Sequence, residues 1–130
     1  MGEYTLTTKN DVVNYLKSNY GAELISDNLY KLLISWNDGR SQLVFVHVND
    51  AFVNVTSPVG ELAEVNLANL VSYVSESTPW GVRMIGDWVC ISDTGFTESM
   101  DAIELDVPIR FISEAADEIE KVVGNGRDVL

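Results

Sequence analysis

The strongest constraint on the fold comes from the segment between Leu29 and Val48. From Leu29 to Trp36 every second side chain is large and apolar, which is the two-residue period of a β-strand. Asp38-Gly39 follows, a pair that tolerates the positive φ angles of a tight hairpin turn. Leu43 to Val48 is then rich in β-branched and aromatic residues. The segment therefore predicts two antiparallel strands joined by a short turn.

Three further strands are expected. Asn49-Asp50 forms a second turn signal, and Ala51 to Thr56 then predicts a third strand beside the first two. Val82–Ile85 and Trp88–Ile91 flank Gly86-Asp87, which is another hairpin signal. The pattern predicts a three-stranded meander followed, later in the chain, by a separate hairpin.

Three segments carry helical periodicity. The first is expected from Thr8 to Tyr20, with Thr8 as N-cap and Gly21 as the residue that ends it. The second is expected from Asn66 to Glu76, where apolar side chains recur at three- and four-residue steps. The third is expected from Pro108 to Val123, because proline suits the first turn of a helix.

The order of these elements predicts one α+β domain with an antiparallel sheet packed by helices: helix, three strands, helix, two strands, helix. With 130 residues, 46% of them apolar, the chain has enough material for one core and no room for two. The stretch from Asp93 to Asp106 allows two interpretations. It prolongs the fifth strand through Phe96, or it adds a short sixth strand from Ala102 to Leu105.

Charge excludes several partner classes. The formal net charge is -12, so the chain lacks the Lys and Arg excess that neutralises nucleic-acid phosphates or anionic lipid. No apolar run approaches the roughly 20 residues of a membrane-spanning helix. Cys90 is the single cysteine, and the first residues show no signal-peptide pattern. We expect a cytoplasmic protein that binds neither nucleic acid nor membrane.

Residues that suggest catalysis occur without the context that catalysis needs. Asp93-Thr94-Gly95 matches the aspartic-protease triplet, but Ser92 stands where that site has an apolar residue. His47 and Cys90 each lie in an apolar strand, and one histidine with one cysteine cannot form a conventional zinc set. No glycine-rich phosphate loop precedes a helix. We expect a protein that is not an enzyme and that has no catalytic residues, metal or cofactor.

The element order resembles the type III secretion chaperone-like fold, which the YbjN-like families share. The likeness includes the Thr78-Pro79-Trp80 entry into a strand, the Gly86-Asp87 turn and the helix from Pro108 to Val123. The acidic stretch 93–106 departs from it. Proteins of this kind are small, acidic, cytosolic and generally homodimeric, and they bind an extended segment of another protein. The resemblance therefore implies a homodimer whose partner is a protein or peptide segment.

Two sets of residues are predicted to carry these interactions. Val12, Leu16 and Tyr20 are expected to line a partner-binding groove, the alternative being that all three are core. The dimer interface is expected to involve one set on the second helix and the tryptophans beyond it: Leu70, Val74, Trp80 and Trp88. A different hypothesis explains the charge equally well, an acidic immunity or antitoxin-type inhibitor that blocks a basic partner. A neighbouring toxin gene would favour that hypothesis over a chaperone-like module.

Overall fold

The computed structural model describes residues 5–36, 38–77, 81–97 and 100–123. Three helices and six strands follow one another in the order α1, β1 to β4, α2, β5, β6, α3. Their bounds are α1 Lys9–Tyr20, β1 Glu23–Ser26, β2 Leu29–Ser35, β3 Ser41–Val48, β4 Phe52–Glu61, α2 Leu67–Ser77, β5 Gly81–Ile85, β6 Trp88–Phe96 and α3 Ala102–Val123. The α+β class and the antiparallel sheet are confirmed, with four strands before α2 rather than three.

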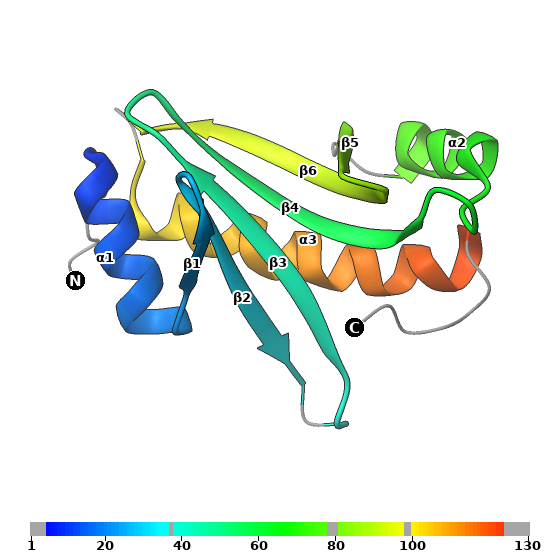
Figure 1. Ribbon diagram of the computed structural model, residues 1–130, viewed down its shortest axis with the longest axis horizontal. Helices are drawn as coiled ribbons and strands as arrows, with labels where there is room; N and C mark the ends of the chain where they lie inside the picture. The colour runs from blue at the N-terminus through cyan, green and yellow to red at the C-terminus, as the bar shows by residue number, and fades with distance from the viewer. Residues whose placement is uncertain (1–4, 37, 78–80, 98–99, 124–130) are drawn as a thin grey trace.

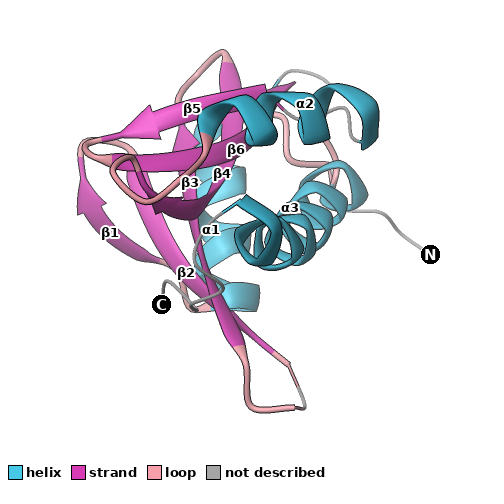
Figure 2. Cartoon of the chain, turned by 90° about the vertical axis from the view of Figure 1, so that its right-hand side faces the viewer, coloured by secondary structure: helices cyan, strands magenta, loops and turns pink. Residues whose placement is uncertain are grey.

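The six strands form one antiparallel sheet in the order β1-β2-β3-β4-β6-β5. The long helix α3 runs along one face of this sheet, with α1 near its beginning and α2 near its end (Figure 1). Seen from the side, the strands and helices form two layers (Figure 2). The two short helices therefore occupy opposite ends of one long helix, and β1 and β5 are the edges of the sheet.

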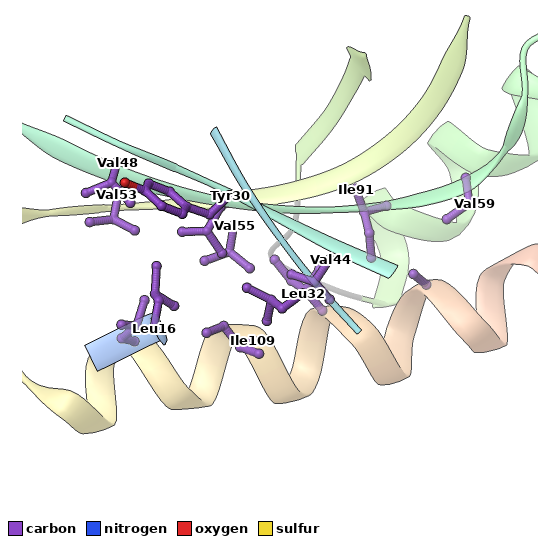
Figure 3. Close-up of a cluster of buried hydrophobic side chains, with 14 of the residues drawn as sticks. Leu16, Tyr30, Leu32, Val44, Val48, Val53, Val55, Val59, Ile91 and Ile109 are labelled. Atoms are coloured by element: carbon purple, nitrogen blue, oxygen red, sulfur yellow. The ribbon is translucent and has the colours of Figure 1, made fainter. Parts of the chain in front are cut away.

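The core lies between the sheet and α3, and alternation along the strands builds it. In β3 the side chains of Val44, Val46 and Val48 are fully buried, whereas those between them are half-exposed. Ile109 of α3 and Leu16 of α1 lie across from these strand residues in the same cluster (Figure 3), to which Ile112 of α3 also belongs. Each buried aliphatic side chain contributes roughly 1.5–3 kcal/mol relative to exposure.

Both ends of α1 form as the sequence predicts. The Thr8 side chain accepts a hydrogen bond from the Asp11 backbone N–H at 3.2 Å, so it is the N-cap. Gly21 has φ 63°, a left-handed conformation that glycine adopts without steric cost. The Ala22 N–H then donates to the Leu16 carbonyl at 3.3 Å, which closes the last turn.

Strand β1 is absent from the prediction. It forms an antiparallel pair with β2, and Asp27-Asn28 is the turn between them, with Asn28 at φ 59°. Every residue of β1 is exposed, so the strand has no buried face to create the alternation that marks a strand in sequence. Asparagine tolerates positive φ better than most residues. Asp27-Asn28 was therefore the one local pattern that could have indicated a turn, and with it a strand before β2.

Strand β4 continues past the expected end at Thr56 and passes through Pro58 to Glu61. Proline lacks the backbone N–H that a strand residue donates to its neighbouring strand, so it is disfavoured where a strand is paired on both sides. Pairing of β4 with β3 ends at Thr56, so Pro58 is paired only with β6, opposite Cys90. The buried Gln42 side chain donates to the Pro58 carbonyl at 2.8 Å and to Ser57 Oγ at 3.0 Å, replacing the missing ladder contacts.

The acidic stretch after Asp93 resolves into two elements. Strand β6 continues through Phe96, as one of the two interpretations expected. The segment from Ala102 to Leu105 is the first turn of α3 and not a strand, so α3 begins six residues before Pro108. Asp101 caps it, its carboxylate accepting from the Glu104 N–H at 2.8 Å. Asp101 followed three residues later by Glu104 is the capping pattern that could have revealed this start.

Candidate protein-binding surfaces

The prediction that Val12 and Leu16 line an exposed groove is wrong. Both side chains have no exposed surface, because they point from α1 into the main core. Tyr20 is half-buried and packs against the same core. Val12 and Leu16, four residues apart, share one face of α1, and this narrow apolar face is the one that the core covers. The alternative that these residues belong to the core is the one the structure supports.

Tyr20 instead takes part in a hydrogen-bonded cluster between α1 and α3, the tyrosine–Asp106 contact. The Tyr15 hydroxyl donates to Asp106 Oδ2 at 2.7 Å, and the Tyr20 hydroxyl donates to Asp106 Oδ1 at 2.6 Å. Burial, reinforced by this bond to the carboxylate, raises the pKa of Tyr20 well above its ordinary value. Both oxygens of Asp106 are thus engaged in holding α1 onto α3, which is a structural role.

The residues of α2 that were predicted to form the dimer interface face the core of the protein and not its surface. Leu70 has no exposed surface and Val74 is 7% exposed, because both face the core. Trp88 at the start of β6 is half-buried, and Trp80, like the Thr78-Pro79 before it, lies outside the described residues. Leu70 and Val74 are therefore not available to a second copy of the chain.

The opposite side of α2 is also apolar. Leu67 is 43% exposed and Val71 is 53% exposed, one helical turn apart on the same face. Both views place α2 beside the edge strand β5, where Val82 and Met84 are exposed to a similar degree (Figures 1 and 2). The backbones of α2 and β5 thus lie beside each other at this end of the molecule, and each element carries two exposed apolar side chains. We refer to Leu67, Val71, Val82 and Met84 as the α2–β5 surface.

The other sheet edge is β1. Leu24 and Ile25 lie in it with large exposed fractions. A hollow of about 430 Å³ lies beside them, bounded by Lys9 at the start of α1 and by Tyr30 of β2. An edge strand presents unpaired backbone N–H and C=O groups that can accept another strand. The β1 edge is therefore a site where an extended chain can pair, and Val12, Leu16 and Tyr20 are not among the residues that line its hollow.

The candidate catalytic residues are not brought together. His47 is half-exposed on β3 and contacts the Phe52 ring edge-on at 5.9 Å between centroids. Cys90 is fully buried on β6, and burial raises the pKa of its thiol to about 11. The sheet register puts them two strands and four residues apart, roughly 16 Å at the usual strand spacings. This separation excludes a Cys–His nucleophilic pair in this conformation.

Asp93 lies in the middle of β6, opposite Val55 on the sheet face that α3 covers. Burial raises the pKa of its carboxyl group, and a hydrogen bond to the Thr94 backbone partly opposes that shift. The Asp93-Thr94-Gly95 triplet is thus a paired strand segment and does not form a loop that presents the carboxylate.

Within the described ranges, no three His, Cys, Asp or Glu side chains gather as a metal site needs. None of the helices in those ranges combines the length and apolar character that crossing a bilayer requires. No protein-family model matches the chain, and no curated protein matches it in sequence. The arrangement of exposed apolar side chains at the two sheet edges is therefore the main guide to function.

Proposed function

We propose that this protein is a non-enzymatic, homodimeric binding module that captures an extended segment of a partner protein. The observation that carries the proposal is that both edges of the sheet bear exposed apolar side chains, Leu24 and Ile25 on β1 and Val82 and Met84 on β5. Natural sheets usually blunt such edges with charges, prolines or covering loops. Edges that keep their apolar side chains are typical of surfaces that pair with another chain.

The β1 edge suits the partner segment. An extended peptide gains affinity from main-chain hydrogen bonds to an edge strand and specificity from alternate side chains that enter neighbouring hollows. The hollow bounded by Lys9, Leu24, Ile25 and Tyr30 lies where such side chains arrive. The chaperone-like resemblance implies the same mode of binding, and a cytoplasmic location is part of the proposal.

The α2–β5 surface suits a second copy of the chain. It combines an edge strand with an apolar helix face, so a two-fold arrangement can bury both together. Helix α2 is thus still proposed to form the dimer interface, as the sequence predicted. The residues proposed to form it are now Leu67 and Val71, because Leu70 and Val74 face inward.

A pair of matched substitutions tests the partner edge. Leu24 on β1 and Leu33 on β2, outside the part of β2 that pairs with β1, are 56% and 53% exposed, so Asp at either position costs little stability. We expect Leu24→Asp to lose, by about tenfold or more, a partner captured from the native cell by wild-type protein. Leu33→Asp is expected to retain it. Equal capture by both variants contradicts the assignment of the β1 edge.

Hydrogen exchange sharpens the same test, because strand addition protects backbone amides that side-chain contact leaves open. We expect the β1 amides to become protected when the partner binds. The non-enzymatic part of the proposal is tested by Asp93→Asn and Cys90→Ala, which are expected to leave the cellular phenotype intact. Loss of function in Asp93→Asn with unchanged melting temperature overturns that part.

A further inference from the structure

A third apolar surface lies at the end of β6, beyond the residues that pair with β5. It is a groove of about 390 Å³ between the end of β6 and the first turns of α3, and we call it the α3 groove. Its lining includes Phe96 of β6, and Ile103 and Val107 of α3, which are 67%, 53% and 36% exposed. Ile103, Val107 and Phe111 recur every four residues on the helix. Phe111 lies beyond the groove, and the Arg110 guanidinium lies over its ring, 4.8 Å from the centroid.

The charge around the α3 groove is acidic. Between Ala102 and Ile119 the sequence holds five carboxylates and one base, Arg110. Two of these acids are engaged inside the protein, since Asp106 accepts the two tyrosine hydroxyls and Asp117 forms an ion pair with Arg40. Glu104 and Glu114 are exposed on the helix, and Asp93 and Glu104 line the groove itself. The rim therefore attracts cations.

Pro108 adds a backbone acceptor at the same place. A proline inside a helix has no N–H to donate to the carbonyl four residues earlier, which here belongs to Glu104. Pro108 and Glu104 both line the α3 groove. The Glu104 carbonyl thus loses its regular helical donor at the groove.

We propose that the α3 groove binds a basic amphipathic helix of the partner protein. The apolar side of that helix packs on Phe96, Ile103 and Val107, and its Lys or Arg side chains contact Glu104 and Asp93. The inference rests on the proposed binding function and adds a second partner element to the extended segment at β1. Apolar contacts supply most of the affinity in such helix-in-groove recognition, and opposite charge speeds association and fixes orientation.

The two carboxylates that line the α3 groove, Asp93 and Glu104, decide among possible occupants by their negative charge. A second copy of this chain carries the same net charge of -12, so the acidic rim repels it. An anionic lipid surface is repelled for the same reason. A basic helix is the occupant whose charge the rim complements.

The probe is a fluorescein-labelled peptide of about 14 residues, with leucines at helical spacing on one side and lysines on the other. A matched peptide replaces every lysine by glutamate. Fluorescence anisotropy at low salt is expected to detect the lysine peptide and not the glutamate peptide. Equal binding of both peptides, or binding of neither, overturns the inference.

Variants locate the binding. Ile103→Asp is expected to weaken the lysine peptide about tenfold, whereas Leu33→Asp, equally exposed on β2, changes it less than about twofold. Ile103→Ser serves as a second variant if circular dichroism shows Ile103→Asp to be unfolded. The double variant Glu104→Gln, Glu114→Gln is expected to weaken binding by about threefold at low salt and less at high salt. Equal affinity of wild type and Ile103→Asp contradicts the site.

Three further outcomes separate this inference from the proposed function. If Ile103→Asp changes the mass measured by light scattering, the groove covers a second copy and the inference fails. If the lysine peptide does not bind but partner capture still depends on Leu24, the α3 groove is wrong and the β1 edge stands. If the peptide binds in an Ile103-dependent manner but capture ignores Leu24, the β1 edge is wrong.

Discussion

Helices α1 and α2 dock at opposite ends of α3 with the same number of buried anchors, yet their outer faces differ. Val12 and Leu16 anchor α1, and Leu70 and Val74 anchor α2, each pair one helical turn apart. Outside these anchors α1 is mostly polar, is capped at both ends and is tied to α3 through Asp106. Helix α2 exposes two further aliphatic side chains, Leu67 and Val71. The comparison teaches that α1 completes the monomer, whereas α2 carries apolar surface beyond what the monomer uses.

The largest expected effect is loss of an anchor. Leu16→Ala is expected to lower the free energy of unfolding by ~2–5 kcal/mol, because it removes buried methyl groups and leaves a cavity. Leu70→Ala is expected to fall in the same range, since the two helices are anchored alike. Urea unfolding measures both, with the exposed Val71→Ala as a control expected within about 0.5 kcal/mol of wild type. A cost below about 1 kcal/mol for Leu16→Ala contradicts the buried position of its side chain.

The next effect concerns a feature that only α1 has. Asp106→Ala removes the acceptor of two tyrosine hydroxyls, and we expect a loss of about 1–3 kcal/mol in unfolding free energy. Glu114→Ala, at an exposed position of the same helix, is the matched control and is expected to change stability by about 0.5 kcal/mol or less. Equal stability of the two variants means that the tyrosine–Asp106 contact does not hold α1 in place.

The same contact makes stability depend on alkaline pH. The pKa of Tyr20 is higher in the folded protein than its ordinary value of 10.0, because burial disfavours the phenolate. The resulting stability is fully present below pH 10. It declines above pH 10, where the unfolded chain ionises first, and is lost as the pH rises through the folded pKa. The unfolding free energies of wild type and Tyr20→Phe are to be compared from pH 8 to 11. We expect the unfolding free energy to fall more steeply with pH in wild type. Parallel profiles would mean that Tyr20 ionisation does not cause the loss.

The smallest effect on stability is expected at the α2–β5 surface, although the effect on assembly is large. Val71→Glu and Met84→Glu replace exposed side chains, so the monomer is expected to keep its stability within about 0.5 kcal/mol. Light scattering is expected to give twice the chain mass of 14.4 kDa for wild type and the monomer mass for either variant. Asn14→Glu on the exposed side of α1 is expected to remain dimeric. A monomeric wild type at micromolar concentration removes the proposed role of this surface.

The elements that the sequence determined by itself are those whose signals are local. Thr8 and Gly21 bound α1 because a side-chain cap and a left-handed glycine act within one helical turn. The turns at Gly39 and Gly86 have the positive φ angles that the Asp-Gly and Gly-Asp pairs predicted. The core face of β3 likewise follows from alternation within one strand. The α+β class and the order of the helices and of every strand except β1 could be predicted from such signals.

Other boundaries depended on contacts between distant segments. Strand β1 exists because it pairs with β2, and its exposed residues carry no pattern of burial. Helix α3 starts before Pro108 because Asp101 caps it and because Leu105 is buried in the core. A proline disturbs only its own N–H and the turn before it, so buried side chains on both sides can sustain the helix. The periodicity of the sequence does not indicate which distant segments pair or pack together, so it could not predict these boundaries.

The candidate site depended on tertiary structure most of all. On α2 the apolar stripe of Leu67, Leu70, Val71 and Val74 is wider than the contact with the core, and periodicity alone could not say which half faces inward. The register of α2 against α3 buries Leu70 and Val74 and leaves Leu67 and Val71 outside. The apolar stripe of α1 is narrower, and its residues Val12 and Leu16 are both buried in the core. The sequence determined which residues are apolar, and only packing decided which of them remain free to bind, because exposure is a property of neighbours that are distant in the chain.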